Sequence, residues 1–269
     1  MKLLSPLNVG TMRLKNRIVL SPITTSYANQ DQTPSERLMK YLERRSQGGV
    51  GLITTELITV DVEHRYLPRT MTLGDDRFID CHRELVDRVH AHGAKVQPQI
   101  SHPGPDTVAP LLGDTQSVGP SVAVAPVWGC ASRALGVDEI ETIAAQYGEA
   151  ARRSREAGYD GIELHAAHAY NLIGSFLSQY RNKRKDDYAG YSQQGRLKFL
   201  LQVLQEIRQR AGGDFPVTLS ISGYERNPGG RSIDDTPSIA PQLVAAGVDC
   251  FRVSGGVSDL LVSPIVPRT

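Results

Sequence analysis

The chain has 269 residues, of which 40% are hydrophobic, and its 30 basic and 29 acidic side chains leave a formal net charge of +1. This length suits one large core or two small ones, and so balanced a charge argues against nucleic acid and anionic membranes as partners. The spacing of Cys81, Cys130 and Cys250 argues against a zinc knuckle, an iron–sulfur site or a disulfide framework, and no apolar run resembles a signal peptide or a membrane span, so we expect a cytoplasmic protein.

Short apolar runs alternate with longer segments of helical period along the chain. We expect strands at 17–22, 50–56, 94–101, 160–166, 215–222 and 248–256. The segments between them predict helices at 35–49, 76–93, 137–158, 195–213 and 232–247, several of which end in glycine. Strands this short and this apolar are typical of a parallel sheet that is buried on both faces.

Repeated β-α units of this length predict either a (β/α)₈ barrel of the TIM type or a doubly wound open sheet. The glycine-rich stretches "SQGGVG" and "NPGGRS" lie before a strand and in a loop, whereas a dinucleotide fold places its glycines directly after a strand. Polar residues instead gather at the C-terminal ends of the strands, where barrels hold their chemistry: Thr24, Thr25, Ser26, Glu56, Gln99, His102, His165, His168, Tyr170 and Ser222. We therefore expect an α/β barrel.

The strand count is too small for a closed barrel. About six strands are predicted, whereas a (β/α)₈ barrel needs eight, so we expect one domain over residues 1–269 that is incomplete at its C-terminal end. Either the remaining wall is absent from this chain, or a partner supplies it, or the barrel is an atypical open one.

Two imidazoles and a phenol follow the strand at 160–166. His165 and His168 can both reach one pocket, where neutral N–H groups can hold a carbonyl or phenolate oxygen, and Tyr170 can give a proton to a substrate carbon. The alternative is structural: locally hydrogen-bonded histidines and a packed tyrosine. Zinc would need a third ligand that the sequence does not indicate. The other histidines, His64, His82, His90 and His92, are explained by a solvated surface.

Five blocks resemble the Old Yellow Enzyme family in order and at family spacing: "PLNVGTMRLKNRIVLSPITTS", "RRSQGGVGLITTELITV", "AKVQPQISHPG", "SREAGYDGIELHAAHAY" and "FLSQYRNKRKDDYAG". The resemblance runs from about residue 3 to about residue 256 and is strongest to the branch containing bacterial 2,4-dienoyl-CoA reductases. It implies FMN, reduced by NADH or NADPH, and hydride transfer to an activated C=C bond. It also implies that His165 and His168 anchor the substrate oxygen and that Tyr170 is the general acid.

The resemblance also implies which residues hold the flavin. Pro22, Ile23 and Thr24 match family residues that meet the ring near N5, and Leu57 matches a small residue that packs against it. Gln99 matches a family glutamine, and its amide can both donate to and accept from the ring edge.

A further block, "RNKRKDDYAGYSQQGR", matches the family through Asn182, Arg184, Asp186, Tyr188 and Gly190. We expect it to be a hydrogen-bonded loop without a chemical function. It departs from the family pattern at Ala189, Tyr191 and Gly195.

Two other departures leave alternatives open. Thr218 stands where the family has an arginine that stabilises negative charge on the flavin, and a hydroxyl cannot replace that charge. The loops that normally bind the FMN phosphate follow strands seven and eight, which this chain lacks. A flavin-free barrel that catalyses proton transfer, as an isomerase, cyclase or lyase, is one alternative. A non-catalytic subunit completed by a partner chain is another. Each of these hypotheses is compatible with a homo-oligomer.

Overall fold

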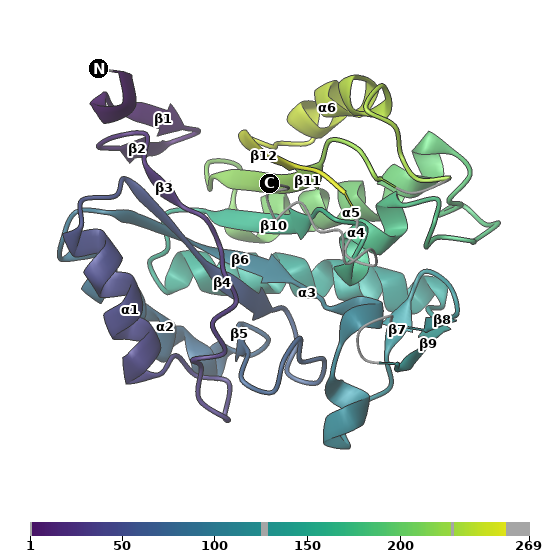
Figure 1. Cartoon of the computed structure of the whole chain (residues 1–269), viewed down its shortest axis with the longest axis horizontal. Coiled ribbons are helices and arrows are strands. Elements are labelled where there is room, and N and C mark those ends of the chain that lie inside the picture. The colour runs from purple at the N-terminus through teal and green to yellow at the C-terminus, as the bar shows by residue number, and fades with distance from the viewer. Residues whose placement is uncertain (1, 125–128, 227–228, 257–269) are drawn as a thin grey trace, which may run out of the picture.

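A curled sheet of parallel strands forms the centre of the structure, a computed structural model that describes residues 2–124, 129–226 and 229–256. Six strands lie side by side in chain order (Figure 1): β3 (Val19–Leu20), β4 (Leu52–Thr59), β6 (Lys95–Ser101), β10 (Ile162–Ala166), β11 (Val217–Ser222) and β12 (Cys250–Ser254). The short β5 (Met71–Thr72) adds to β4 off this path. All six predicted strands are confirmed, and their order is that of a barrel wall that is open between β3 and β12 over the described residues.

Helices connect successive strands, as predicted: α1 (Glu36–Gln47), α2 (Ile79–His90), α3 (Val137–Glu156), α5 (Gln193–Ala211) and α6 (Asp235–Ala245). Serine residues begin two of them, because Ser35 Oγ accepts a hydrogen bond from Leu38 N and Ser192 Oγ accepts one from Gly195 N. None of the helices in the described segments is long and apolar enough to cross a membrane.

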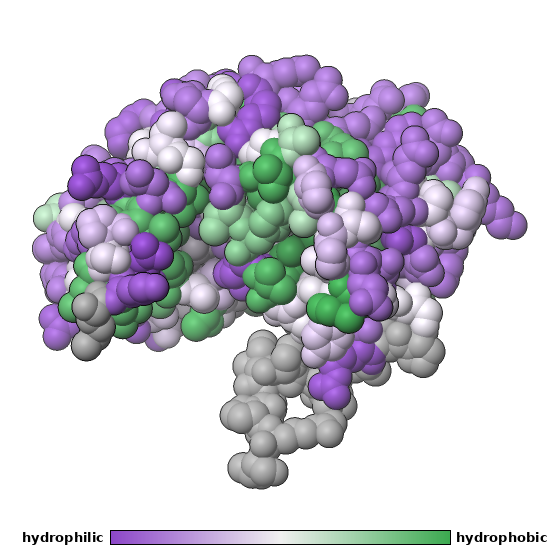
Figure 2. All heavy atoms as spheres, turned by 90° about the horizontal axis from the view of Figure 1, so that it is seen from above, coloured by the Kyte–Doolittle hydropathy of each residue, from purple (hydrophilic) through white to green (hydrophobic). Residues whose placement is uncertain are grey.

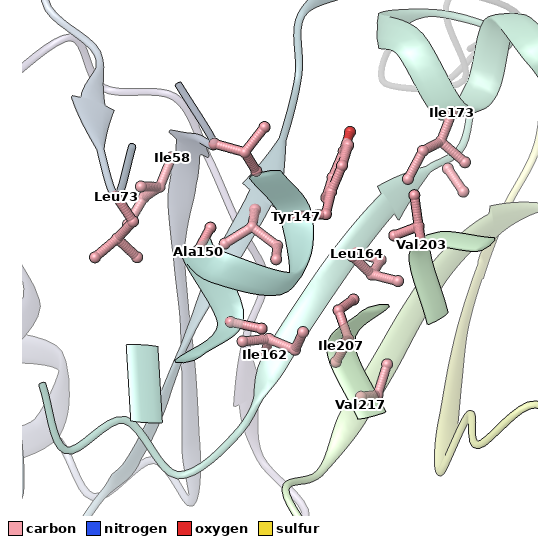
Figure 3. Packing of buried hydrophobic residues seen from close by; sticks show 14 of the residues in the cluster. Ile58, Leu73, Tyr147, Ala150, Ile162, Leu164, Ile173, Val203, Ile207 and Val217 are labelled. Atoms are coloured by element: carbon pink, nitrogen blue, oxygen red, sulfur yellow. The ribbon is translucent and has the colours of Figure 1, made fainter. Parts of the chain in front are cut away.

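The core lies between the helices and the outer face of the sheet. Figure 3 shows Ile162, Leu164 and Val217 of the strands packed among side chains of α3 and α5. Tyr147 is fully buried there, and its hydroxyl accepts a hydrogen bond of 2.7 Å from His102 N. The core therefore also fixes the loop that follows β6, at the end of the strands where polar residues gather.

Polar and apolar side chains alternate along the strands, although both faces of the sheet are buried. Odd positions of β10 and even positions of β11 turn polar side chains to the concave face, and the intervening positions pack in the core. The polar positions are Glu163, His165, Thr218, Ser220 and Ser222. Figure 2 shows the hollowed side of the molecule, where apolar residues line a recess between more hydrophilic flanks.

Several short elements were not predicted. A hairpin of β1 (Leu7–Val9) and β2 (Met12–Leu14) packs against Leu52 and Cys250 at the start of their strands. A small sheet joins β7 (Val118–Gly119), β8 (Ala123–Val124) and β9 (Ala131–Ala134), and α4 (Asn171–Leu177) follows β10. The remaining pieces are 3₁₀ turns at Lys2–Leu4, Asp76–Phe78, Gly104–Asp106 and Ala109–Leu112. Such pieces are too short for hydrophobic periodicity to reveal.

Candidate active site

His165 ends the polar face of β10, and His168 and Tyr170 follow it on a tight connection to α4. Three residues of this connection that are not glycine have left-handed backbones, with φ of 63° at His168, 51° at Ala169 and 56° at Asn171. A run of such residues costs conformational energy and is typical of functional sites. It is held by Asn171 N, which donates to Asp106 Oδ2 at 2.8 Å, and by His168 N, which donates to Ser222 Oγ at 2.6 Å.

The structure brings the three predicted side chains together. The Tyr170 ring lies edge-on to His165, with centroids 4.7 Å apart, and is stacked on His168 at 6.0 Å. His168 Nε2 lies 2.5 Å from Ser254 Oγ of β12. His165 is 3% exposed, and its Nδ1 has no hydrogen-bond partner among the described residues. One nitrogen of this ring is therefore buried without a partner in the described part of the protein.

Burial sets the protonation state of all three groups. The pKa of His165 is lowered to about 3, first by burial and then by the neighbouring His168 and Arg252. The pKa of His168 is also lowered, first by burial and then by Arg252. Burial raises the pKa of Tyr170 well above its ordinary value, and the neighbouring Tyr66 adds to this. At neutral pH the site therefore contains two uncharged imidazoles and a protonated phenol.

Tyr66 was not identified from the sequence. It lies in the loop after β4, and its ring is 6.1 Å from that of Tyr170. Tyr66 is itself partly buried, and burial raises its pKa. A second protonated phenol therefore lies beside Tyr170.

A polar layer lies one step below the histidines on the concave face. Gln99 Nε2 donates to Glu163 Oε1 at 2.7 Å, and Arg252 of β12 donates to both oxygens of the same carboxylate at 2.9 to 3.2 Å. Arg252 Nη2 also donates to Ser220 Oγ at 2.7 Å. Glu163 and Arg252 were not identified as site residues, although the alternation of polar and apolar residues in β10 and β12 was visible in the sequence.

The residues predicted to meet the flavin lie in two places. Leu57 and Gln99 are register partners on neighbouring strands, and both are buried. Pro22 is half-buried, while Ile23 and Thr24 are exposed, with Ile23 at 62%. This segment is tied to β4 next to Leu57, because the hydroxyl of the following residue, Thr25, donates to Glu56 Oε2 at 2.6 Å.

Thr218 is part of a second hydrogen-bonded group further down the strands. Its Oγ1 donates to Gln97 Oε1 at 3.3 Å, and Gln97 Nε2 donates to Thr54 Oγ1 at 3.0 Å. Thr218 contributes no positive charge to the interior of the barrel. The structure places the Arg252 guanidinium beside Ser220, which is two residues further along β11.

The prediction that four other histidines lie on a solvated surface was wrong for two of them. His82 is fully buried, with Nδ1 2.8 Å from the Tyr159 hydroxyl and Nε2 3.0 Å from Thr72 O. The His64 side chain is 12% exposed and pairs with Asp61 at 3.0 Å. His90 and His92 are half-exposed. A helical face tolerates a buried histidine when both ring nitrogens find partners, which the sequence alone does not show.

Asp61, His64 and His102 place three possible metal-ligand atoms within 4.8 Å of one another. However, Gly104 N donates to His102 Nδ1 at 2.9 Å, so that nitrogen has the lone pair and Nε2 has the proton. His102 Nε2 lies 3.1 Å from Asp61 Oδ2. A neutral imidazole in this tautomer has no lone pair at Nε2 for a metal, so the cluster is better explained as hydrogen bonds that join the loops after β4 and β6.

The block from Asn182 to Gly190 is the hydrogen-bonded loop that the sequence predicts. Asn182 Nδ2 donates to Phe176 O at 3.0 Å and to Tyr188 O at 2.8 Å, and Arg184 pairs with Asp186. Gly190 is required by packing, since a Cβ there would lie 1.9 Å from Asn182 O. The loop therefore supports the end of α4 rather than contributing a reactive group.

Comparisons with known proteins agree with this arrangement. The family model of the NADH:flavin oxidoreductase / NADH oxidase family matches residues 2–253. The chain is 36% identical over 260 residues to an NADH oxidase of Thermoanaerobacter brockii, a match that covers 96% of the chain and 40% of that protein. It is 34% identical to a cinnamate reductase of Clostridium sporogenes, with 96% of the chain and 42% of that protein covered.

Solved structures of related proteins have a similar fold. The Old Yellow Enzyme homologue of Zymomonas mobilis superimposes with a TM-score of 0.84 at 26% identity, over 98% of this chain and 76% of that one. The chain thus spans about two fifths of the two sequence relatives. Together with the family match over nearly the whole chain, these likenesses show that the protein belongs to the NADH:flavin oxidoreductase / NADH oxidase family, which includes the Old Yellow Enzymes.

Proposed function

We propose that this chain is an FMN-dependent oxidoreductase unit that passes hydride from NADH or NADPH, through the flavin, to an activated C=C bond. One observation supports this most directly: His165, uncharged and buried with a free ring nitrogen, lies against Tyr170, whose pKa is raised. The pair combines an oxygen-binding donor with a proton source at one point of the pocket. The name of the cinnamate reductase relative supports a conjugated alkene as the substrate class.

The residues present suit a flavin. Gln99 and Glu163, joined by a hydrogen bond, offer polar groups on the concave face. The buried polar atoms that lack a partner among the described residues include His165 Nδ1 and Glu56 Oε1. We propose that Leu57 and Gln99 hold the ring from the strands, and that Pro22, Ile23 and Thr24 meet its other side. FMN, when bound, supplies the hydride that is transferred.

In this proposal the protein's own groups complete the reaction. His165 and His168 donate hydrogen bonds to the substrate carbonyl oxygen and stabilise the negative charge that develops when hydride reaches the β-carbon. Tyr170 then gives its phenolic proton to the α-carbon, and solvent returns a proton to the phenol. The ring of Tyr66 lies 6.1 Å from that of Tyr170 and borders the proton source.

The first experiment is a visible absorption spectrum of the purified chain with and without added FMN. A flavin spectrum that shifts on binding, and that NADH or NADPH bleaches under anaerobic conditions, is the expected result. Addition of cinnamate or another activated alkene should then restore the oxidised spectrum. A folded protein that leaves the FMN spectrum unchanged would contradict the proposal and favour the flavin-free alternative, in which the same three residues transfer protons only.

We further infer a cytoplasmic protein that acts on small molecules, and the balanced charge of the chain supports this. A homo-oligomer, or a partner chain beside β12, remains a prediction that sedimentation of the purified protein can test.

A further inference from the structure

We propose that Arg252 supplies the positive charge that this barrel presents to the pyrimidine edge of the flavin, from β12 rather than from β11. This inference rests on the proposed function, since it concerns how FMN is held. Lys95 and Arg252 are the basic residues of the six sheet strands in the described segments. Lys95 pairs with Asp160 at the start of β6, so Arg252 is the cation at the site end.

The Arg252 guanidinium is held in place, but one of its nitrogens has no hydrogen-bond partner among the described residues. Nε and Nη2 donate to the Glu163 carboxylate, and Nη2 also donates to Ser220 Oγ. Nη1 has no hydrogen-bond partner among the described residues, and the Arg252 side chain is 30% exposed. Glu163 is 1% exposed, so the ion pair is anchored at its buried end while the free end of a planar donor group faces the open side.

The anchoring carboxylate also orients Gln99. Glu163 Oε1 accepts from Gln99 Nε2 at 2.7 Å and from Arg252 Nη2 at 2.9 Å. One buried acid therefore sets the direction of both the amide and the guanidinium. An amide and a cation side by side match the pyrimidine edge of a flavin, where carbonyl oxygens accept hydrogen bonds and negative charge gathers on reduction.

The register explains how a neighbouring strand can provide this charge. Ser220 and Arg252 are paired across β11 and β12, and His165 is the partner of Ser220 on β10. A serine at position 220 is small enough to let the arginine lie over it and accepts one of its hydrogen bonds. Position 220 of β11 is the register partner of position 252, so a positive charge can be presented from either strand at this level of the barrel.

The test measures FMN affinity by flavin fluorescence and the flavin midpoint potential for the unmodified chain, Arg252→Met and Arg252→Lys. We expect Arg252→Met to weaken FMN binding by about 10-fold to 100-fold, the effect of losing one hydrogen bond to a charged group. Its midpoint potential should fall, because the negative charge of the reduced ring loses its partner. Arg252→Lys should keep most of the potential, since it keeps the charge. Arg83→Met on the outer surface of α2 is the matched control.

Two further variants separate this function from a structural one. Arg252→Met leaves Glu163 buried without its partner, so Glu163→Gln/Arg252→Met removes both charges and should show the same fall in potential. Ser220→Arg/Arg252→Ser transposes the pair and should recover affinity and potential. A folded transposed variant that behaves like Arg252→Met, or an Arg252→Met protein with unchanged affinity and potential, would overturn the inference alone. Failure of the unmodified chain to bind FMN would overturn the proposed function together with it.

Discussion

At the residue scale, the site depends on side chains that burial keeps uncharged. Among the described residues His165 has no acidic partner, so the cost of placing a charged imidazole in a buried position dominates its pKa. An uncharged ring donates a hydrogen bond without protonating the substrate oxygen, and this leaves proton transfer to Tyr170. In the proposed reaction the two uncharged imidazoles therefore donate hydrogen bonds to the substrate, and the phenol supplies the proton.

This division of roles predicts that the His165 ring does not titrate between pH 8 and pH 4. Because the pKa of His165 is lowered to about 3, its ring should stay neutral from pH 8 down to pH 4. Nitrogen-15 NMR of the histidine side chains, assigned with a His165→Asn variant, measures this directly. A His165 signal that titrates between pH 5 and pH 7 would show that the ring is more hydrated than the structure indicates.

Tyr170→Phe tests the proton source. The phenyl ring keeps the contacts with His165 and His168 but has no proton to give, so alkene reduction should slow by about 10²-fold to 10⁴-fold. Reduction of the flavin by NADH should be unchanged, because no phenolic proton takes part in it. Stopped-flow absorbance separates the two half-reactions, with Tyr191→Phe, which is 73% exposed, as the control. Equal slowing of both halves would instead indicate a damaged pocket.

At the element scale, each strand separates structure from chemistry by its alternation. Leu164 and Leu219 of β10 and β11 pack in the core, whereas Glu163, His165 and Ser220 face the concave side. A shift of one residue in register would exchange the two sets, so the core specifies where the polar groups lie. Side chains of helices α3 and α5 pack against the outer faces of these strands (Figure 3).

Leu204→Ala in α5 should therefore reduce the free energy of unfolding by about 2 to 5 kcal/mol, because the removed atoms leave a cavity in a fully buried site. Leu111→Ala makes the same chemical change where the side chain is 61% exposed and should cost little. Urea denaturation of both variants measures the difference. Similar losses in the two would mean that α5 does not pack on the sheet as described.

At the scale of the whole molecule, the polar groups of distant segments meet at one end of an open barrel. Asp106, Glu163, Ser222 and Ser254 come from four separate parts of the chain, yet all support the connection or the strand ends around His168. The hairpin of β1 and β2 packs at the opposite end. The site thus depends on the complete curvature of the sheet rather than on any one β-α unit.

Two buried histidines predict how stability depends on pH. The pKa is lowered to about 4 at His82 and to about 3 at His165, whereas an unfolded histidine has a pKa of about 6.5. Below pH 6.5 the unfolded chain therefore binds more protons than the folded one, and stability falls as the pH falls towards these values. The combined loss should reach a few kcal/mol by about pH 4.

Urea midpoints measured between pH 7 and pH 4 test this dependence. His82→Gln keeps an amide that can bond to Tyr159 and Thr72 and should flatten the slope below pH 6.5. An unchanged slope in this variant would assign the acid sensitivity to other groups.

Local sequence patterns predict the six parallel strands, the five main helices and the combination of His165, His168 and Tyr170 at and beyond the end of the fourth predicted strand. These follow from local periodicity and from positions at strand ends, both of which neighbouring residues define. The folded molecule was needed to show that Tyr66 lies beside Tyr170, that Glu163 joins Gln99 to Arg252, and that His82 is buried. Each of these depends on strands or loops far apart in the chain, and side-chain reach across a curled sheet is a property of the packed molecule that no local pattern encodes.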